Sequence, residues 1–282
     1  MDRSSESQHF FFNDQVEMMS WSAFKKKDGL TLIELLIALV LSSILIAALY
    51  RAFISQQKTY TVQDQVADMQ QNVRGAIGQM VKEIRMAGYG GDLAIFGSIN
   101  GFTEMITPAD HSITIILADE IGALKQNVAK GTNQLKVTNA RVFNTDKKKY
   151  LCLNGLNNYL VQSITGDTIL LTTSLAEGHP INEPVYLVKA ISYDLGLRGS
   201  KTILRRNENT GGGAQPLAEN IEGLQFIYFD KNGDETVSPP DIRMVKVTVT
   251  SRTDMLDPGY KGGDGYRRRT LSTNIKVRNM GI

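Results

Sequence analysis

Residues 30–50 read LTLIELLIALVLSSILIAALY, and this apolar stretch decides the fold. As an α-helix rising ~1.5 Å per residue it would be about 31 Å long, which matches the hydrocarbon core of a bilayer. Glu34 is its one charged residue. The stretch is apolar on all sides, whereas a helix on the surface of a soluble core has a polar face. The pattern therefore predicts a transmembrane helix, with a buried core helix as the alternative.

The segment before the apolar stretch is polar and ends in a basic cluster. Lys25, Lys26 and Lys27 lie directly on the N-terminal side of the predicted span. Because basic flanks stay on the cytoplasmic side of a membrane, the N-terminus is expected to be cytoplasmic. Translation starting at Met1, Met18 or Met19 would keep this flank, and the sequence leaves the three starts open.

Helical periodicity continues beyond the span, over residues 51–91. Apolar residues recur there at spacings of three and four, which indicates one face of an amphipathic helix. The stripe consists of Val62, Val66, Met69, Val73, Ala76, Met80 and Ile84. The other faces, Glu83 among them, are expected to be polar and exposed. No proline precedes Pro108, so one helix can run from about residue 30 to about residue 86, where glycines follow.

Beyond residue 91 the apolar period changes to two, which is typical of strands. Gly166 and Asp167 are expected to form a hairpin turn between two of them. The predicted strands are 113–117, 134–138, 159–164, 168–173, 185–193, 202–205, 224–229, 244–250 and 270–277. The expected fold class is α+β. A long N-terminal helix, transmembrane in its first half, packs with its second half on an antiparallel, β-rich head formed by residues 92–282.

Residues that carry chemistry are sparse. Cys152 is the only cysteine, so no intramolecular disulfide is possible, and its apolar neighbours predict a buried, inert thiol. The three histidines lack metal-ligand spacing, and no nucleophile elbow, zinc-protease motif or complete phosphate-binding loop occurs. We therefore expect no enzyme. A formal net charge of +2 does not indicate a nucleic-acid partner.

One loop has the spacing of an EF-hand. Residues 230–241 place oxygen-bearing side chains at loop positions 1, 3, 5, 7, 9 and 12, the rhythm of calcium ligands. The candidate calcium ligands are Asp230, Asn232, Asp234, Thr236 and Asp241. Glu235 stands where an EF-hand has glycine, and strands rather than helices are predicted on both sides. The alternative is an ordinary hairpin loop turned by Asn232 and Gly233.

The junction at Gly29 is the most specific local signal. A secretory signal peptide has its small-residue cleavage site after the apolar stretch, whereas here the small residue precedes it. The order Lys-Lys-Lys-Asp-Gly followed by Leu-Thr-Leu-Ile-Glu resembles the signal of type IV prepilins. The resemblance implies that prepilin peptidase removes residues 1–29 by cutting after Gly29, and that Leu30 is then N-methylated. Leu30 replaces the phenylalanine usual in that family but keeps an apolar first residue, so processing is still expected.

Glu34 needs a partner. A carboxylate inside a membrane helix costs about 2.5–3.5 kcal/mol on insertion scales. Glu34 would be the fifth residue of the processed chain, and the resemblance to pilins implies that it pairs with the N-terminal amine of a neighbouring subunit. Opposite charges in a low-dielectric bundle attract strongly and would fix axial register. The alternative is a glutamate that reaches the lipid head groups.

Three further segments resemble particular groups within the type IV pilin family. Residues 83–89 resemble the helix end of PilW-like minor pilins. Residues 217–226 resemble a short helix and strand that those proteins share with the J-type pseudopilins of type II secretion, and residues 268–279 resemble their last strand. Residues 97–213 carry no such resemblance.

The resemblance implies a minor type IV pilin that primes or caps a pilus. Its expected partners are prepilin peptidase, other major and minor pilins, the pilus assembly platform and the inner membrane. The head is expected in the periplasm, and later in the fibre or at its tip. Two alternatives stay open: a minor pseudopilin of a type II secretion system, and a membrane-anchored binding protein that never assembles.

Overall fold

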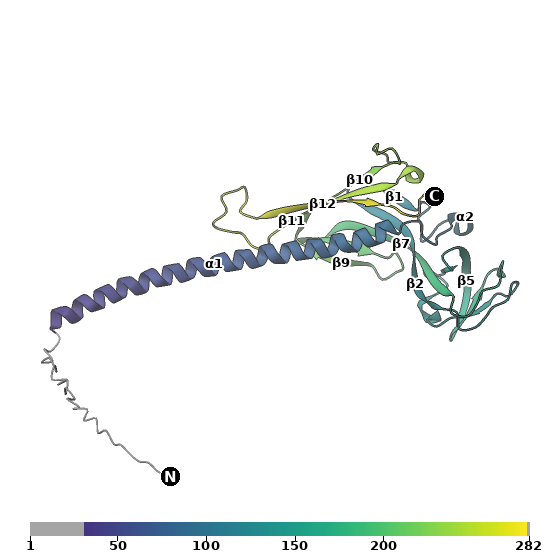
Figure 1. The fold of residues 1–282 in the computed structure, drawn as a ribbon, viewed down its shortest axis with the longest axis horizontal. Helices are drawn as coiled ribbons and strands as arrows, with labels where there is room; N and C mark the ends of the chain where they lie inside the picture. Colours follow the sequence, from purple (N-terminus) through teal and green to yellow (C-terminus); the bar gives the residue numbers. More distant parts are fainter. Residues whose placement is uncertain (1–30, 281–282) are drawn as a thin grey trace, which may run out of the picture. The chain divides into compact units, whose positions relative to one another are not determined.

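The structure, a computed structural model, describes residues 31–280 of the chain. The chain divides into two compact units, residues 1–57 and 58–282. Helix α1 (Leu32–Arg85) is unbroken and contributes to both units (Figure 1). Its ends lie within two residues of those predicted from the apolar pattern, and β-strands make up most of the chain after it. The predicted α+β fold, with one long N-terminal helix before an antiparallel β-rich head, is confirmed.

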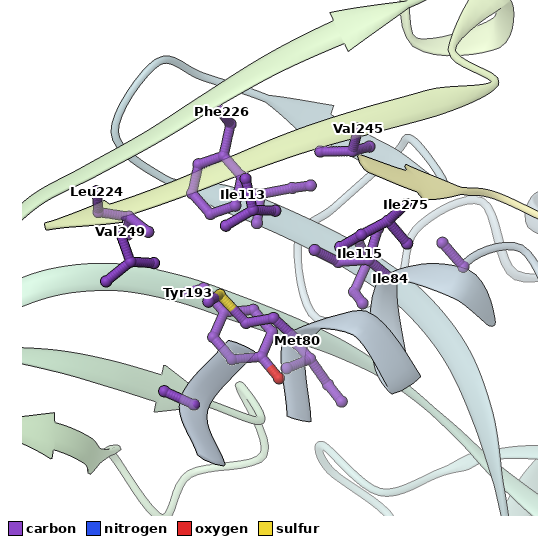
Figure 2. Close-up of a cluster of buried hydrophobic side chains, with 14 of the residues drawn as sticks. Met80, Ile84, Ile113, Ile115, Tyr193, Leu224, Phe226, Val245, Val249 and Ile275 are labelled. Atoms are coloured by element: carbon purple, nitrogen blue, oxygen red, sulfur yellow. The ribbon is translucent and has the colours of Figure 1, made fainter. Parts of the chain in front are cut away.

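Within residues 58–282, α1 packs on the head through the predicted stripe. Met69, Val73, Ala76, Met80 and Ile84 are buried, and Val62 and Val66 are half-buried. Figure 2 shows Met80 and Ile84 among apolar side chains from the strands of the head. Because burial of the four larger side chains, those of Met69, Val73, Met80 and Ile84, contributes ~1.5–3 kcal/mol each, the stripe holds this part of the helix on the head.

The larger of two sheets has nine strands in the described part of the chain. They follow the order β1-β2-β7-β4-β5-β6-β3, with β8 paired to β7 and β9 paired to β8, and every pairing is antiparallel. The strands are β1 (Ile106–Pro108), β2 (Ile113–Ala123), β3 (Gln134–Lys136), β4 (Tyr150–Leu153), β5 (Asn157–Thr165), β6 (Thr168–Leu171), β7 (Pro184–Arg198), β8 (Lys201–Asn207) and β9 (Ala214–Glu219).

Strand β2 is buried on both faces. Ile113, Ile115 and Leu117 belong to the core that includes α1, whereas Ile116 and Ala118 belong to a second core on the other face. Successive side chains of a strand point to opposite faces, so a strand covered on both sides needs a continuous apolar run. This explains the run of isoleucines in β2, and the continuous buried stretches of β4 and β7 have the same pattern.

The smaller sheet is three-stranded, in the order β10 (Ile221–Phe229), β11 (Met244–Arg252) and β12 (Arg268–Lys276). Val245, Val247 and Val249 of β11 alternate with half-buried residues and enter the same core as Met80 and Ile84. One face of this sheet is therefore buried towards the shared core.

All nine predicted strands are present, and the hairpin turned by Gly166 and Asp167 joins β5 to β6 as predicted. Strands β1, β4 and β9 are not among the predicted ones. The short helix expected from the resemblance at residues 217–226 is wrong, because this segment forms the end of β9 and most of β10. A helix of one turn, α2 (Leu93–Phe96), comes after α1, and 3₁₀ turns occur at Ala140–Val142 and Pro239–Asp241.

Candidate assembly site

The first half of α1 exposes apolar side chains on all sides. Within residues 32–53, the large apolar side chains are solvent-exposed, with exposed fractions between 45% for Val40 and 84% for Leu32. By length and composition, α1 is the helix in the described part of the chain that can cross a membrane. So much exposed apolar surface has to be covered by lipid or by other apolar helices.

Glu34 lies in the first turn of α1, where it forms a capping box with Thr31. Its Oε2 accepts hydrogen bonds from the backbone N–H of Thr31 at 2.9 Å and from the Thr31 hydroxyl at 2.8 Å. The Thr31 Oγ1 in turn accepts from the backbone N–H of Glu34 at 3.3 Å. This reciprocal arrangement satisfies donors that have no partner within the helix.

The capping box changes the interpretation of Glu34. Its carboxylate already has a partner within its own chain, which the sequence interpretation did not include, although the Thr-x-x-Glu spacing before an apolar run signals it. Within residues 31–280, Oε1 accepts no hydrogen bond, so one carboxylate oxygen stays free for a cationic group from outside the chain. A negative charge in the first turn also complements the positive end of the helix dipole.

Gly29 and Leu30, the predicted processing residues, and the lysines of the predicted cytoplasmic flank lie outside the described residues. Their predicted roles rest on the sequence. Thr31, the first described residue, is the residue after Leu30 and caps the helix. A new N-terminus at Leu30 would therefore lie one residue before the cap.

The candidate calcium loop joins β10 to β11 and is built as a hydrogen-bonded turn. The Asp230 Oδ1 accepts from the backbone N–H groups of Asn232 at 2.8 Å and Asp234 at 3.0 Å, and Oδ2 accepts from the Asn232 amide at 3.1 Å. Gly233, with φ of 90°, supplies the left-handed backbone that the turn requires. Among residues 31–280, no three or more His, Cys, Asp or Glu side chains are grouped so that they could hold a metal ion. Calcium binding at Asp230, Asn232, Asp234, Thr236 and Asp241 stays a prediction.

Replacing Asp230 with alanine is expected to lower the melting temperature by a few degrees in chelator, because the turn loses the acceptor of its backbone N–H groups. Desolvation opposes ionisation of Asp230, but hydrogen bonds from Asp234, Asn232 and Gly233 outweigh it and lower the pKa of the carboxyl. The contribution is therefore complete above the ordinary pKa of an aspartate and is lost as the pH falls below it. Thermal melts monitored by circular dichroism measure both effects.

Asp241→Ala is the matched control for this loop. The Asp241 side chain is exposed and makes no hydrogen bond to the turn within the described residues, so its loss should leave stability unchanged. A calcium-specific rise in melting temperature that both substitutions abolish would show that the loop is a calcium site rather than only a turn.

A buried charged cluster joins α1 to the larger sheet. Glu83 is only 7% exposed, which corrects its expected place on a polar face. Its carboxylate accepts hydrogen bonds from the Tyr193 hydroxyl and the Gln79 amide, and from Arg206 at 2.8–3.1 Å. Met80 and Ala76 lie three and seven positions earlier on the buried stripe, so helical spacing places Glu83 on the same side of α1.

The cluster continues from Arg206 across the sheet. Arg206 also pairs with Glu208 at 2.9 Å, and Lys189 pairs with both Glu208 and Asp119 at 2.7 Å. Burial raises the pKa of the Tyr193 hydroxyl, so it stays protonated and remains a donor to Glu83. The cluster fixes the orientation of residues 79–83 relative to β7 and β8.

Cys152 is buried in β4, as predicted, and burial raises the pKa of its thiol to about 12. A thiol that stays protonated at neutral pH is a poor nucleophile. No functional role is assigned to it.

The comparison with known families covers the N-terminal part of the chain. Residues 24–50 match the prokaryotic N-terminal methylation motif. The match covers the predicted processing junction and the first part of α1, and leaves residues 1–23 and 51–282 outside it. The chain matches no curated protein and no solved structure. The motif supports a prepilin-type protein, of the pilin-like or pseudopilin kind, that is processed by prepilin peptidase, and is consistent with membrane anchoring.

Proposed function

We propose that the chain is a minor type IV pilin, a structural subunit that primes or caps assembly of a pilus. The observation that carries the proposal is the methylation motif at residues 24–50 on a helix whose apolar side chains are exposed on all sides and whose first turn holds Glu34. Such a helix is suited to storage in a membrane and then to packing against other apolar helices. No catalytic role is proposed.

In this role the first half of α1 has two successive environments. Before assembly, lipid covers the apolar side chains and holds the subunit in the inner membrane. After cleavage behind Gly29, the amine of a neighbouring subunit occupies the free Oε1 side of Glu34, while Thr31 keeps Oε2. The charge pair fixes the axial register, and neighbouring apolar helices replace lipid.

The size of the head favours a minor subunit over a major one. The described strands of both sheets all lie within residues 92–282, and a head of this size would crowd the close packing of a fibre made of identical subunits. A minor pseudopilin of type II secretion would share the same signal. Deletion of the gene separates the two, since loss of surface fibres supports the pilin and loss of a secreted protein with intact fibres supports the pseudopilin.

Glu34→Leu and Glu34→Gln are expected to insert into the membrane normally but to enter sheared fibres at least tenfold less than the wild type. Both remove the charge that the neighbour's amine requires, and each tenfold change corresponds to about 1.4 kcal/mol. The measurement is an immunoblot of the sheared-fibre fraction against the membrane fraction of the same cells.

Thr31→Ala separates pairing with a neighbour from helix capping. It removes the hydroxyl of the capping box but leaves the carboxylate, so its incorporation into fibres should stay within about fivefold of the wild type, since a lost cap costs about 1 kcal/mol or less when the backbone bond remains. Normal assembly of Glu34→Gln together with failure of Thr31→Ala would show that capping alone is the role of Glu34. Normal assembly of Glu34→Leu would contradict the proposed charge pair outright.

A further inference from the structure

Strand β12 forms one edge of the smaller sheet and pairs only with β11 within the described residues. The backbone N–H of Thr253 donates to the carbonyl of Arg267 at 2.9 Å, and that of Val277 donates to the carbonyl of Arg243 at 2.9 Å. Between these two bonds the register of β11 and β12 continues without a shift. Because hydrogen-bonded positions in an antiparallel pair recur at every second residue, the odd-numbered residues of β12 bond to β11. The even-numbered residues direct their backbone N–H and C=O groups to the free edge, and these are Arg268, Thr270, Ser272, Asn274 and Lys276.

The free edge of β12 is uncovered along most of its length. Within residues 31–280, no hydrogen bond reaches the backbone groups that point to this edge. The side chains of the same even-numbered residues are exposed. Leu271 and Thr273 point to the same face as the buried Ile275 but are only half-buried, whereas the inward-facing valines of β11 are fully buried. The core therefore ends short of this edge, and space remains beside β12 for another strand.

The other sheet edges among residues 31–280 are short, irregular or covered. Strands β1 and β3 have three residues each, and β9 contains Pro216 and pairs with β8 through a register shift. At the outer edge of β10, the N–H of Phe226 donates to the Asp110 carbonyl at 2.9 Å. Such features keep an edge from pairing with other chains. Strand β12 lacks them, because it has nine residues, no proline, no register shift and an uncharged centre at residues 270–274.

We propose that the edge of β12 binds an extended segment of another protein, which adds to the smaller sheet as a fourth strand. Five backbone N–H groups and five C=O groups in a regular row match the backbone of a β-strand rather than a small ligand. An antiparallel strand would satisfy all of them, because each opposed hydrogen-bonded pair exchanges two bonds. The inference goes beyond the proposed pilin function, since it assigns a recognition surface to the head.

Unpaired charges near the two ends of β12 indicate the composition of the bound segment. Arg269 and Lys276 are exposed, and their side chains make no hydrogen bond or ion pair within residues 31–280. Arg268, by contrast, is already paired with Glu222 and Asp264. Opposite charges on neighbouring strands stabilise a sheet. The segment is therefore acidic near both ends, where carboxylates can pair with Arg269 and Lys276, and uncharged in the middle.

A second copy of the chain does not suit this edge. The N–H of Met255, in the loop before β12, donates to the Gln65 side chain at 3.2 Å, and the N–H of Arg278, after β12, donates to the Arg85 carbonyl at 3.1 Å. Residues 65–85 of α1 and strand β12 therefore run in the same direction. Two β12 strands paired antiparallel would direct their α1 helices oppositely, whereas subunits anchored in one membrane need both helices in one direction. The partner is therefore a different protein.

The test measures binding of a labelled peptide to the full chain in an uncharged detergent, by fluorescence anisotropy. The probe is Glu-Val-Thr-Val-Thr-Val-Thr-Glu-Thr, which in antiparallel register places its two glutamates opposite Lys276 and Arg269. We expect saturable binding, and a peptide with lysine in place of both glutamates should bind about fivefold more weakly. Absence of saturable binding would overturn the proposal, because strand addition depends on the backbone more than on the sequence of the added segment.

Ser272→Pro removes a backbone N–H from the free edge and none of the bonds to β11. Proline is tolerated at an edge position whose N–H faces solvent, so the fold should be retained while the peptide binds about tenfold more weakly. Ser272→Ala is the matched control, since it changes the side chain but keeps the N–H, and it should bind like the wild type. Equal binding by both variants would show that the peptide does not add to β12.

Cross-linking tests the register without relying on the proline variant. Cys152 is buried, so Ser272→Cys gives the chain one accessible thiol. A peptide with cysteine at its fifth position should form a disulfide with this variant, because Cα atoms of an opposed hydrogen-bonded pair lie ~5.5 Å apart. Cysteine at the ninth position lies four residues, or ~13 Å, further along and should not react.

Two outcomes of the cross-linking would overturn the proposal. Equal reaction of both peptides would mean that the peptide has no fixed register on β12. A disulfide dimer of Ser272→Cys that forms as fast without peptide would assign the edge to a second copy of the chain. These measurements require neither processing nor fibre assembly, so their failure would leave the proposed pilin function untouched.

Discussion

Glu83→Ala is expected to lower the free energy of unfolding of the head by about 3 kcal/mol, near the lower end of the range for removing one partner of a buried ion pair. The substitution leaves the guanidinium of Arg206 and the hydroxyl of Tyr193 without their main acceptor. Arg206 keeps Glu208 at 2.9 Å, which places the loss at the lower end. For a domain of this size, the melting temperature should fall by roughly 6–12 °C.

Thermal melts monitored by near-ultraviolet circular dichroism, on the full chain in detergent, measure the loss. Glu104→Ala is the control, because Glu104 is exposed and makes no side-chain hydrogen bond or ion pair within residues 31–280, and it should change stability by less than ~0.5 kcal/mol. Arg206→Ala combined with Glu83→Ala should cost less than the sum of the single changes, since neither charge is then left alone. A Glu83→Ala chain that melts with the control would show that the pair does not stabilise the head.

The cluster should also respond to acid. Burial opposes ionisation of Glu208, but hydrogen bonds from Lys189 and Arg206 outweigh it and lower the pKa of its carboxyl. A lowered pKa stabilises the folded state above the ordinary value for glutamate, and this stabilisation is lost as the pH falls below it. The difference between the wild type and a Glu208→Gln variant should therefore shrink in acid.

Local patterns predicted the elements of this fold well. The stripe from Val62 to Ile84 correctly predicted which face of α1 contacts the head. Segments with an apolar period of two correctly predicted β11 and its neighbours, because these strands bury one face only. Strand β9 was missed because it pairs only with β8 at a sheet edge and carries few buried side chains. The resemblance predicted a short helix within residues 217–226. This segment forms strands instead, because β9 pairs with β8 and β10 pairs with β11.

Functional residues, too, could be predicted where their signal is local in the sequence, but not where it depends on distant strands. Glu34 and the junction at Gly29 are adjacent in the sequence and carry a recognisable motif, which the family comparison supports over residues 24–50. Glu83 was placed on a polar face because its partners, Tyr193 and Arg206, come from distant strands.

Gly29→Leu is expected to abolish processing, so that the full precursor accumulates in the membrane. The small residue lies before the apolar stretch, and a bulky side chain there should block the cut without changing the apolar helix after it. Membrane insertion should be normal, because residues 30–50 supply the span in either case. Intact mass of the membrane-extracted chain should show a wild type that begins at Leu30 with one added methyl group, and a variant that retains the leader.

The uncleaved variant yields two further results. Its mass identifies the true start, because Met1, Met18 and Met19 give different precursors but the same processed chain. Its assembly should fail as completely as that of Glu34→Leu, since a chain that keeps residues 1–29 has no amine at Leu30 to offer a neighbour's Glu34. Gly29→Ala, which adds a single methyl group, should retain part of the processing and serves as the control for size. A wild-type mass that still includes Lys25 to Gly29 would refute the prepilin assignment and leave α1 as a plain membrane anchor.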